Sequence, residues 1–272
     1  MSDDDRTPDG ERKLRLGGMA LANGLLLHGP RAWSVAVRDT SGAVRVATGR
    51  KRSLGGDRLG GLPILRGVVR VGEGFLVIPA ARRALPQARL PFEDRAMLAS
   101  TAGVSALALA LRRSNRVGAF KAEALANGLS AVPALLALRS KKLASYHGAE
   151  HKTIGAYENG TAAADEAKEH ERCGSHLVAP LIVANTALGA LAERLPARHR
   201  RVGRAAAQLL ATGVAVEAFA YAQRRPGSRI AKLLQAPGFA IQAGLGTREP
   251  SADQLAVATA ALDALLRAER KR

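Results

Sequence analysis

Four long apolar segments constrain the fold of this chain more than any other feature. They cover residues 97–111, 122–138, 177–191 and 205–222 and consist mainly of small apolar residues. Each is long enough for a helix, and residues 97–111 fall short of the roughly 20 that a membrane-spanning helix needs. The sequence therefore predicts a mainly α-helical region whose helices are either buried in protein or inserted into a membrane as short segments.

The N-terminal part has a β-like pattern instead. Residues 34–38 and 44–47 are strand-like and flank the turn-forming residues 39–42, which predicts a hairpin. The apolar, glycine-containing residues 17–27 predict a third strand, and residues 49–61 a basic loop. The expected fold class is therefore α+β, with a small N-terminal β-module followed by a helical bundle.

These patterns divide the chain into four parts. A disordered leader, acidic at Asp3, Asp4 and Asp5, is expected at residues 1–13, the β-module at 14–62 and the helical bundle at 63–245. Residues 246–272 should form a C-terminal amphipathic helix, because Ser251 and Gln254 have the spacing of a capping box before an apolar stripe.

The charge of the chain indicates an anionic partner. The 41 Lys and Arg residues exceed the 23 Asp and Glu residues, which gives a formal net charge of +18. Such a balance favours a membrane lipid surface or a nucleic acid. Aromatic residues make up only 3% of the chain, so the stacking platforms of single-strand binders are scarce and a membrane surface is favoured.

A short motif in the middle of the chain points to a metal. His147 and His151 stand four residues apart with Glu150 between them, so all three share one helix face. Two imidazoles can supply two ligands of a catalytic zinc ion, and Glu150 can act as the general base on the attacking water. The spacing is the H-x-x-E-H pattern of inverted zincins. The alternative is an ordinary solvated helix face.

The third ligand is left open by the sequence. Glu217 is the first candidate, because an ionisable side chain within an apolar helix is costly unless it is paired or bound to a metal. The alternative explanation is an ion pair with one of the many arginines. Cys173, the only cysteine, is the rival, and together with His170 it would close a structural site. Glu158 is a weaker candidate.

The chain resembles a known bacterial family, the YqhQ-like proteins, which have no established activity. The resemblance implies a metal-dependent, membrane-associated protein and a metal at His147 and His151. It is carried by Gly17, Gly18, Gly24, Leu25, residues 30–38, 66–69, 146–154, 157–160 and 170–174, Glu217, Pro237, Gly238 and residues 247–250.

Two functions follow as hypotheses. In the first, the protein is a zinc-dependent enzyme of the hydrolase class at the bacterial cell membrane, with His147, His151 and Glu217 or Cys173 as ligands and Glu150 as the catalytic base. In the second, it is a basic, non-enzymatic scaffold associated with membrane or ribosome, with a structural His/Cys cluster. If the apolar segments do not insert, a cytoplasmic location is expected.

Overall fold

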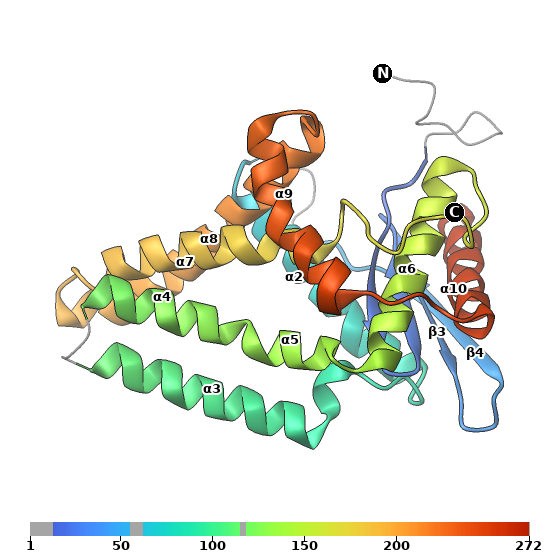
Figure 1. Ribbon diagram of the computed structural model, residues 1–272, viewed down its shortest axis with the longest axis horizontal. Helices are drawn as coiled ribbons and strands as arrows, with labels where there is room; N and C mark the ends of the chain where they lie inside the picture. The colour runs from blue at the N-terminus through green and yellow to red at the C-terminus, as the bar shows by residue number, and fades with distance from the viewer. Residues whose placement is uncertain (1–12, 55–61, 115–117, 272) are drawn as a thin grey trace.

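The computed structural model describes residues 13–54, 62–114 and 118–271 (Figure 1). The predicted disordered leader lies almost entirely outside these residues, as does the second half of the predicted basic loop. An antiparallel sheet precedes a series of helices, which confirms the α+β fold class. The helices are α2 (Leu65–Ala84), α3 (Arg95–Arg113), α4 (Ala119–Ser130), α5 (Val132–Leu138), α6 (Lys141–Asn159), α7 (Val178–Ala192), α8 (Ala197–Arg224), α9 (Arg229–Ile241) and α10 (Ala252–Arg270).

The sheet is a meander in the order β1-β2-β3-β4, with every neighbouring pair antiparallel. The predicted hairpin is confirmed as β3 and β4. The prediction of one strand in residues 17–27 is wrong, because the chain turns at Ala22 and Asn23 and forms two strands. Asn23 fixes this turn by donating its side-chain amide to the carbonyls of Arg38 and Gln87. The strands are β1 (Gly17–Leu21), β2 (Gly24–His28), β3 (Ala32–Arg38) and β4 (Val44–Arg50).

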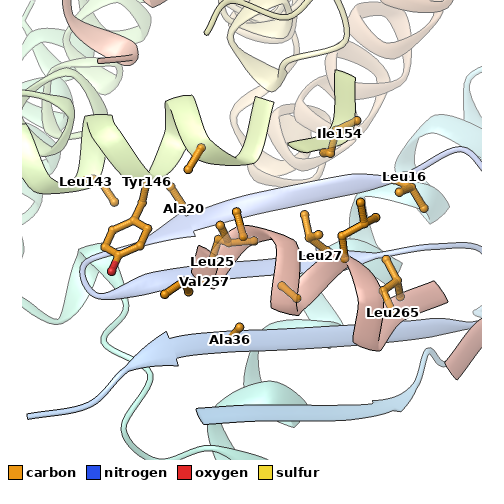
Figure 2. Packing of buried hydrophobic residues seen from close by; sticks show 14 of the residues in the cluster. Leu16, Ala20, Leu25, Leu27, Ala36, Leu143, Tyr146, Ile154, Val257 and Leu265 are labelled. Carbon is orange, nitrogen blue, oxygen red and sulfur yellow. The ribbon is translucent and has the colours of Figure 1, made fainter. Parts of the chain in front are cut away.

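The sheet is covered by helices on both faces. Along β3, Trp33, Val35 and Val37 pack toward α2, while Ala32 and Ala36 pack toward α6 and α10. The strand is therefore buried from Ala32 to Val37, as expected when both faces of a sheet are covered, and its one polar residue in this stretch, Ser34, donates its hydroxyl to the carbonyl of Ala261. Figure 2 shows the second of these cores, between the sheet and the pair α6 and α10. We call the sheet with α6 and α10 the sheet body.

Helices α3, α4, α5, α7 and α8 form a second region, which we call the helical arm. They run side by side away from the sheet body (Figure 1). The predicted apolar segment 122–138 is split into α4 and α5 at Ala131, because Pro133 lacks the N–H that would continue the helical ladder. Two segments, Gly174–Ala192 and Ala197–Arg224, are long and apolar enough to cross a membrane.

The arm is packed through small residues. Its buried apolar positions are glycines and alanines, and large apolar side chains such as Val183, Val202 and Leu209 are exposed. Close approach through small residues is typical of helices that associate inside a membrane. The buried small residues are Ala108 in α3, Ala122 and Ala126 in α4, Ala184, Gly189 and Ala192 in α7, and Ala211, Gly213, Ala215 and Ala222 in α8.

Two further segments join the regions. Helix α2 packs on the sheet through Val77 and Ala81, and its first turns reach α8, where Gly67 lies against Val216. Helix α9 was not predicted; Pro237 and Gly238 interrupt its helical pattern in the sequence. A short π-helix, Gln242–Gly246, follows α9 and leads toward α10, whose predicted capping box between Ser251 and Gln254 is present.

Candidate metal centre

The H-x-x-E-H motif lies on α6. This helix begins after Ser140, whose hydroxyl accepts from the backbone N–H of Leu143, and ends at Gly160, which has a positive φ of 72°. Glu150 and His151 are buried and His147 is half-buried. The motif faces the interior, so the alternative of an ordinary solvated helix face does not apply.

Both motif histidines are oriented by main-chain carbonyls. The Nδ1 of His147 lies 2.7 Å from the carbonyl oxygen of Gly246, and the Nδ1 of His151 lies 2.7 Å from that of Lys168. A carbonyl oxygen can only accept, so each Nδ1 carries the proton and each Nε2 presents a lone pair. This is the arrangement in which the second ring nitrogen of a metal-ligating histidine is held by an outer partner.

Cys173 meets the histidines from a separate segment. Its Sγ lies 3.4 Å from the Nε2 of His147 and accepts from the backbone N–H of Ser175. The side chain of Gln242 in the π-helix holds this segment in place, because its oxygen accepts from the backbone N–H of His170 and its amide donates to the hydroxyl of Ser175. The structure thus joins α6 to a loop that is about 20 residues further along the chain.

The three donors fit a single divalent ion. The ligand atoms of His147, His151 and Cys173 all lie within 4.8 Å of one another. Around a tetrahedral zinc ion, nitrogen and sulfur ligands are roughly 3.4 to 3.8 Å apart. The distance between the Sγ of Cys173 and the Nε2 of His147 already lies in this range. The other distances between donor atoms, at most 4.8 Å, would need to shorten by about 1 Å or less, which small side-chain movements can achieve.

The electrostatic environment favours a neutral His151 imidazole and a protonated Cys173 thiol in the metal-free protein. Burial lowers the pKa of His151 to about 2, and His147 adds to this, so His151 is neutral at physiological pH. Burial also raises the pKa of the Cys173 thiol. A bound cation would stabilise the thiolate, so ligation by Cys173 should release a proton.

Glu150 lies beside this group without joining it. Burial raises the pKa of its carboxyl to about 7; positive charge on His147 opposes the rise and a Cys173 thiolate adds to it. A pKa near neutrality suits a group that both takes up and releases a proton. Gly18 makes room for the carboxyl, because a Cβ at Gly18 would lie 2.6 Å from Oε1 of Glu150.

His170 and Glu158 form a neighbouring pair. The Nδ1 of His170 accepts from the backbone N–H of Arg172, so its Nε2 carries the proton and donates to the Glu158 carboxylate at 3.2 Å. Glu158 also forms an ion pair with Arg172. Both ring nitrogens of His170 are therefore engaged outside the three-donor group, although its ring lies 5.7 Å from that of His151.

Glu217 is not brought into the group. Its two carboxylate oxygens accept from the guanidinium of Arg66 at 2.6 and 2.5 Å, and one of them also accepts from the backbone N–H of Ile64. The costly carboxylate in an apolar helix is thus paired with an arginine, which was the alternative explanation. Of the distant candidate ligands, Cys173 is the one whose side chain meets the two histidines in the fold.

The three donors and Glu150 line a cavity with a volume of about 760 Å³. From this end the cavity extends along α3, α4, α5 and α7, where Met97, Leu135, Leu138, Leu181 and Ile182 form apolar walls. Its volume lies in the range of about 300–1,000 Å³ that is usual for small-molecule sites.

Several residues that build the site escaped prediction. The carbonyls of Lys168 and Gly246 belong to the main chain, so no pattern of residue types in the sequence could predict their role. Gln242 gave no local signal either. Gly18 was part of a glycine-containing stretch for which close backbone approach was expected, but its neighbour Glu150 lies more than 130 residues away.

Comparison with known proteins gives a family without an assigned activity. Residues 135–268 match the family described as "Protein of unknown function (DUF1385)", a span that contains His147, Glu150, His151 and Cys173. The chain is 24% identical over 295 residues to the "Uncharacterized protein YqhQ" of Bacillus subtilis (strain 168), covering 93% of this chain and 92% of that protein. No solved structure matches. Together these similarities support a YqhQ-like family of unknown function.

Proposed function

We propose that this protein is a membrane-associated, zinc-dependent hydrolase, in which His147, His151 and Cys173 hold the ion and Glu150 is the general base. One observation carries the proposal. Two Nε2 lone pairs, one Sγ and one buried carboxyl meet at the same end of a cavity large enough for a small substrate. Such convergence of metal donors with a nearby carboxyl is the arrangement of a hydrolytic zinc site.

The number of available donors favours a catalytic site over a structural one. Structural zinc sites are closed by four protein ligands, whereas catalytic sites use three and keep one position open. His170 would be the fourth ligand, but its Nδ1 accepts from Arg172 and its Nε2 donates to Glu158. This supports a three-ligand set of two histidines and one cysteine.

When bound, the zinc ion would supply Lewis acidity, which polarises a carbonyl group and makes a water more acidic. Glu150 would accept one proton from the attacking water and give it to the leaving group. The carbonyls of Gly246 and Lys168 would keep both imidazoles in the tautomer that presents Nε2. Burial excludes bulk water from Glu150 and keeps its proton affinity high.

Membrane association is proposed from the helical arm. Its outward-facing large apolar side chains and its small-residue interior suit a lipid environment better than water. The first turns of α8 carry the exposed residues Arg198, Arg200 and Arg201, which would meet anionic headgroups.

The test is metal content together with activity in matched variants. Full-length protein purified without a histidine tag should carry about one zinc ion per chain, and a His147→Ala/His151→Ala variant should carry none. Glu150→Gln should keep the metal and lose at least a hundredfold in ester or amide hydrolysis, the usual size of a general-base contribution. Cys173→Ser should bind the metal more weakly.

Two results would overturn the proposal. If wild-type and double-variant proteins are both folded and free of metal, the basic scaffold becomes the better description. If metal is present but Glu150→Gln loses it as well, Glu150 is a ligand and the site is closed. Salt-sensitive release of the protein from membranes or RNA would then be the next observation to make.

A further inference from the structure

We propose that the substrate is an acyl lipid, whose chain lies along the arm portion of the cavity and whose ester or amide carbonyl reaches the His147, His151 and Cys173 end. This inference rests on the proposed hydrolase and adds the substrate class. It is carried by the distribution of chemistry along the cavity, by its connection to the surface of the arm, and by its size.

The cavity is chemically two-ended. The polar end contains the three metal donors and Glu150, all from α6 and the loop before α7. The other end lies between the arm helices and is mainly apolar, with side chains that include Met97, Leu135 and Ile182. Its polar lining residues are Thr101, Asn127, Ser130 and Asn185. Asn127 is hydrogen-bonded to Glu123 and Thr186, and the hydroxyls of Thr101 and Ser130 donate to main-chain carbonyls. An amphiphile with one polar and one apolar part matches this order.

The helices that line the apolar end also carry the exposed apolar surface of the arm. In α7, Leu181 and Ile182 line the cavity while Val183 is 68% exposed, and in α5, Leu135 lines it while Leu136 is exposed. One side of each helix therefore faces the cavity and the other faces outward. A lipid in the proposed membrane could reach the cavity between helices that are apolar on both sides.

The size of the cavity favours a flexible chain over a helical peptide. A helix is about 10 Å across and rises 1.5 Å per residue, so ten residues occupy roughly 1,200 Å³. This exceeds the 760 Å³ of the cavity. A transmembrane helix cannot enter without large rearrangement, whereas an acyl chain can.

A basic cluster stands next to the cavity in the chain. Arg139, Lys141 and Lys142 are exposed and lie between Leu138 and Leu143, both of which line the cavity. Positive charge at this position complements the phosphate of an anionic lipid headgroup.

The reaction balances with water as the only second reactant. The water oxygen forms a bond to the acyl carbon, and the bond between that carbon and the leaving oxygen or nitrogen breaks. Glu150 takes a proton from the water and transfers it to the leaving atom. The products are a carboxylic acid and an alcohol or amine, and no oxidant or reductant is required.

The first experiment measures chain-length dependence. Zinc-loaded, full-length protein in nanodiscs of equal parts phosphatidylcholine and phosphatidylglycerol is given p-nitrophenyl esters from acetyl to palmitoyl. The value of kcat/KM should rise roughly threefold to fourfold per added methylene, the gain for burying one CH₂, until the cavity is filled. A rate independent of chain length would overturn the lipid assignment and leave the hydrolase intact.

The second experiment needs neither metal nor activity. Metal-free protein is photocrosslinked to palmitic acid with a diazirine at its terminal carbon, and labelled residues are mapped. Labels should fall on cavity-lining residues of α5 and α7. Ala134→Trp, which fills the cavity, should reduce labelling at least tenfold, whereas Leu136→Trp, on the outer side of the same helix, should not.

The outcomes separate the two proposals. Labels spread over outer residues such as Val183, and insensitive to Ala134→Trp, would overturn the acyl-chain site. Specific labelling in the cavity without hydrolysis of any ester or amide would support the chain site and overturn the hydrolase. Cleavage of extended peptides only, with no cavity labelling, would replace the lipid by a peptide.

Discussion

The sheet body and the helical arm place their large apolar side chains in opposite positions. In the sheet body Leu25, Leu27 and Leu265 are completely buried, as in a domain folded in water. In the arm Val183 and Leu209 are more than half exposed, and alanines and glycines fill the interior. The two regions therefore bury their apolar surface in different ways, and the three candidate metal donors lie where the regions meet.

The largest expected effect contrasts the two regions with one type of substitution. Leu25→Ala should lower the free energy of unfolding by about 2–5 kcal/mol, because it leaves a cavity in a fully packed core. Leu209→Ala in α8 should change it by less than about 0.5 kcal/mol in detergent. Denaturant unfolding of both variants provides the measurement. Equal losses of unfolding free energy would show that the arm buries its large apolar side chains as a water-soluble domain does.

A charged residue introduced on the outer surface of the arm should show whether lipid or water surrounds that surface. Val183→Arg in α7 should cost about 3 kcal/mol for insertion if this surface meets lipid. The matched control is Val46→Arg on the edge strand β4, where the side chain is exposed to water. This substitution should change the free energy of unfolding by no more than about 0.5 kcal/mol. The measurement is the fraction of each variant that stays with membranes after an alkaline wash, which should fall for Val183→Arg and not for Val46→Arg. Identical behaviour would contradict membrane insertion.

Acid should destabilise the sheet body through His28. Burial lowers the pKa of His28 to about 4, and Lys51 adds to this, whereas the unfolded value is near 6.5. Between these values the unfolded chain binds more protons, so stability falls by roughly 3 kcal/mol as the pH drops from above 6.5 to below 4. His28→Gln should flatten the dependence of the unfolding free energy on pH in this range. The measurement is chemical unfolding of metal-free protein at pH values across that range. An unchanged slope would exclude His28 as its source.

The smallest effect concerns the boundary between the regions. Gly18→Ala should lower the free energy of unfolding by about 1–3 kcal/mol and displace the Glu150 carboxyl. The reason is that the added Cβ would lie within 3 Å of both Glu150 and Leu27. Metal content should stay at the wild-type level while hydrolysis falls. Gly103→Ala in α3 is the control, since nothing lies within 4 Å of its Cβ. Loss of metal in Gly18→Ala would mean that the glycine shapes the ligands as well.

The sequence allowed most of the fold to be predicted and half of the candidate site. Apolar segments and strand-like alternation gave the α+β class, and helical spacing placed His147, Glu150 and His151 on one face. The sequence favoured Glu217 as the third ligand, with Cys173 as the rival, because residue type and spacing do not show which side chain the fold brings to the histidines. Only the fold shows that Arg66 holds Glu217 and that the loop after Lys168 carries Cys173 to the histidines.

The way in which the imidazoles are held has an evolutionary consequence. The acceptors for His147 and His151 are carbonyl oxygens of Gly246 and Lys168, and every amino acid supplies such an oxygen. Substitutions at position 168 can therefore leave the proton on Nδ1 of His151 unchanged as long as the backbone keeps its course. Proteins of this family could differ widely in these segments and still present the same two lone pairs.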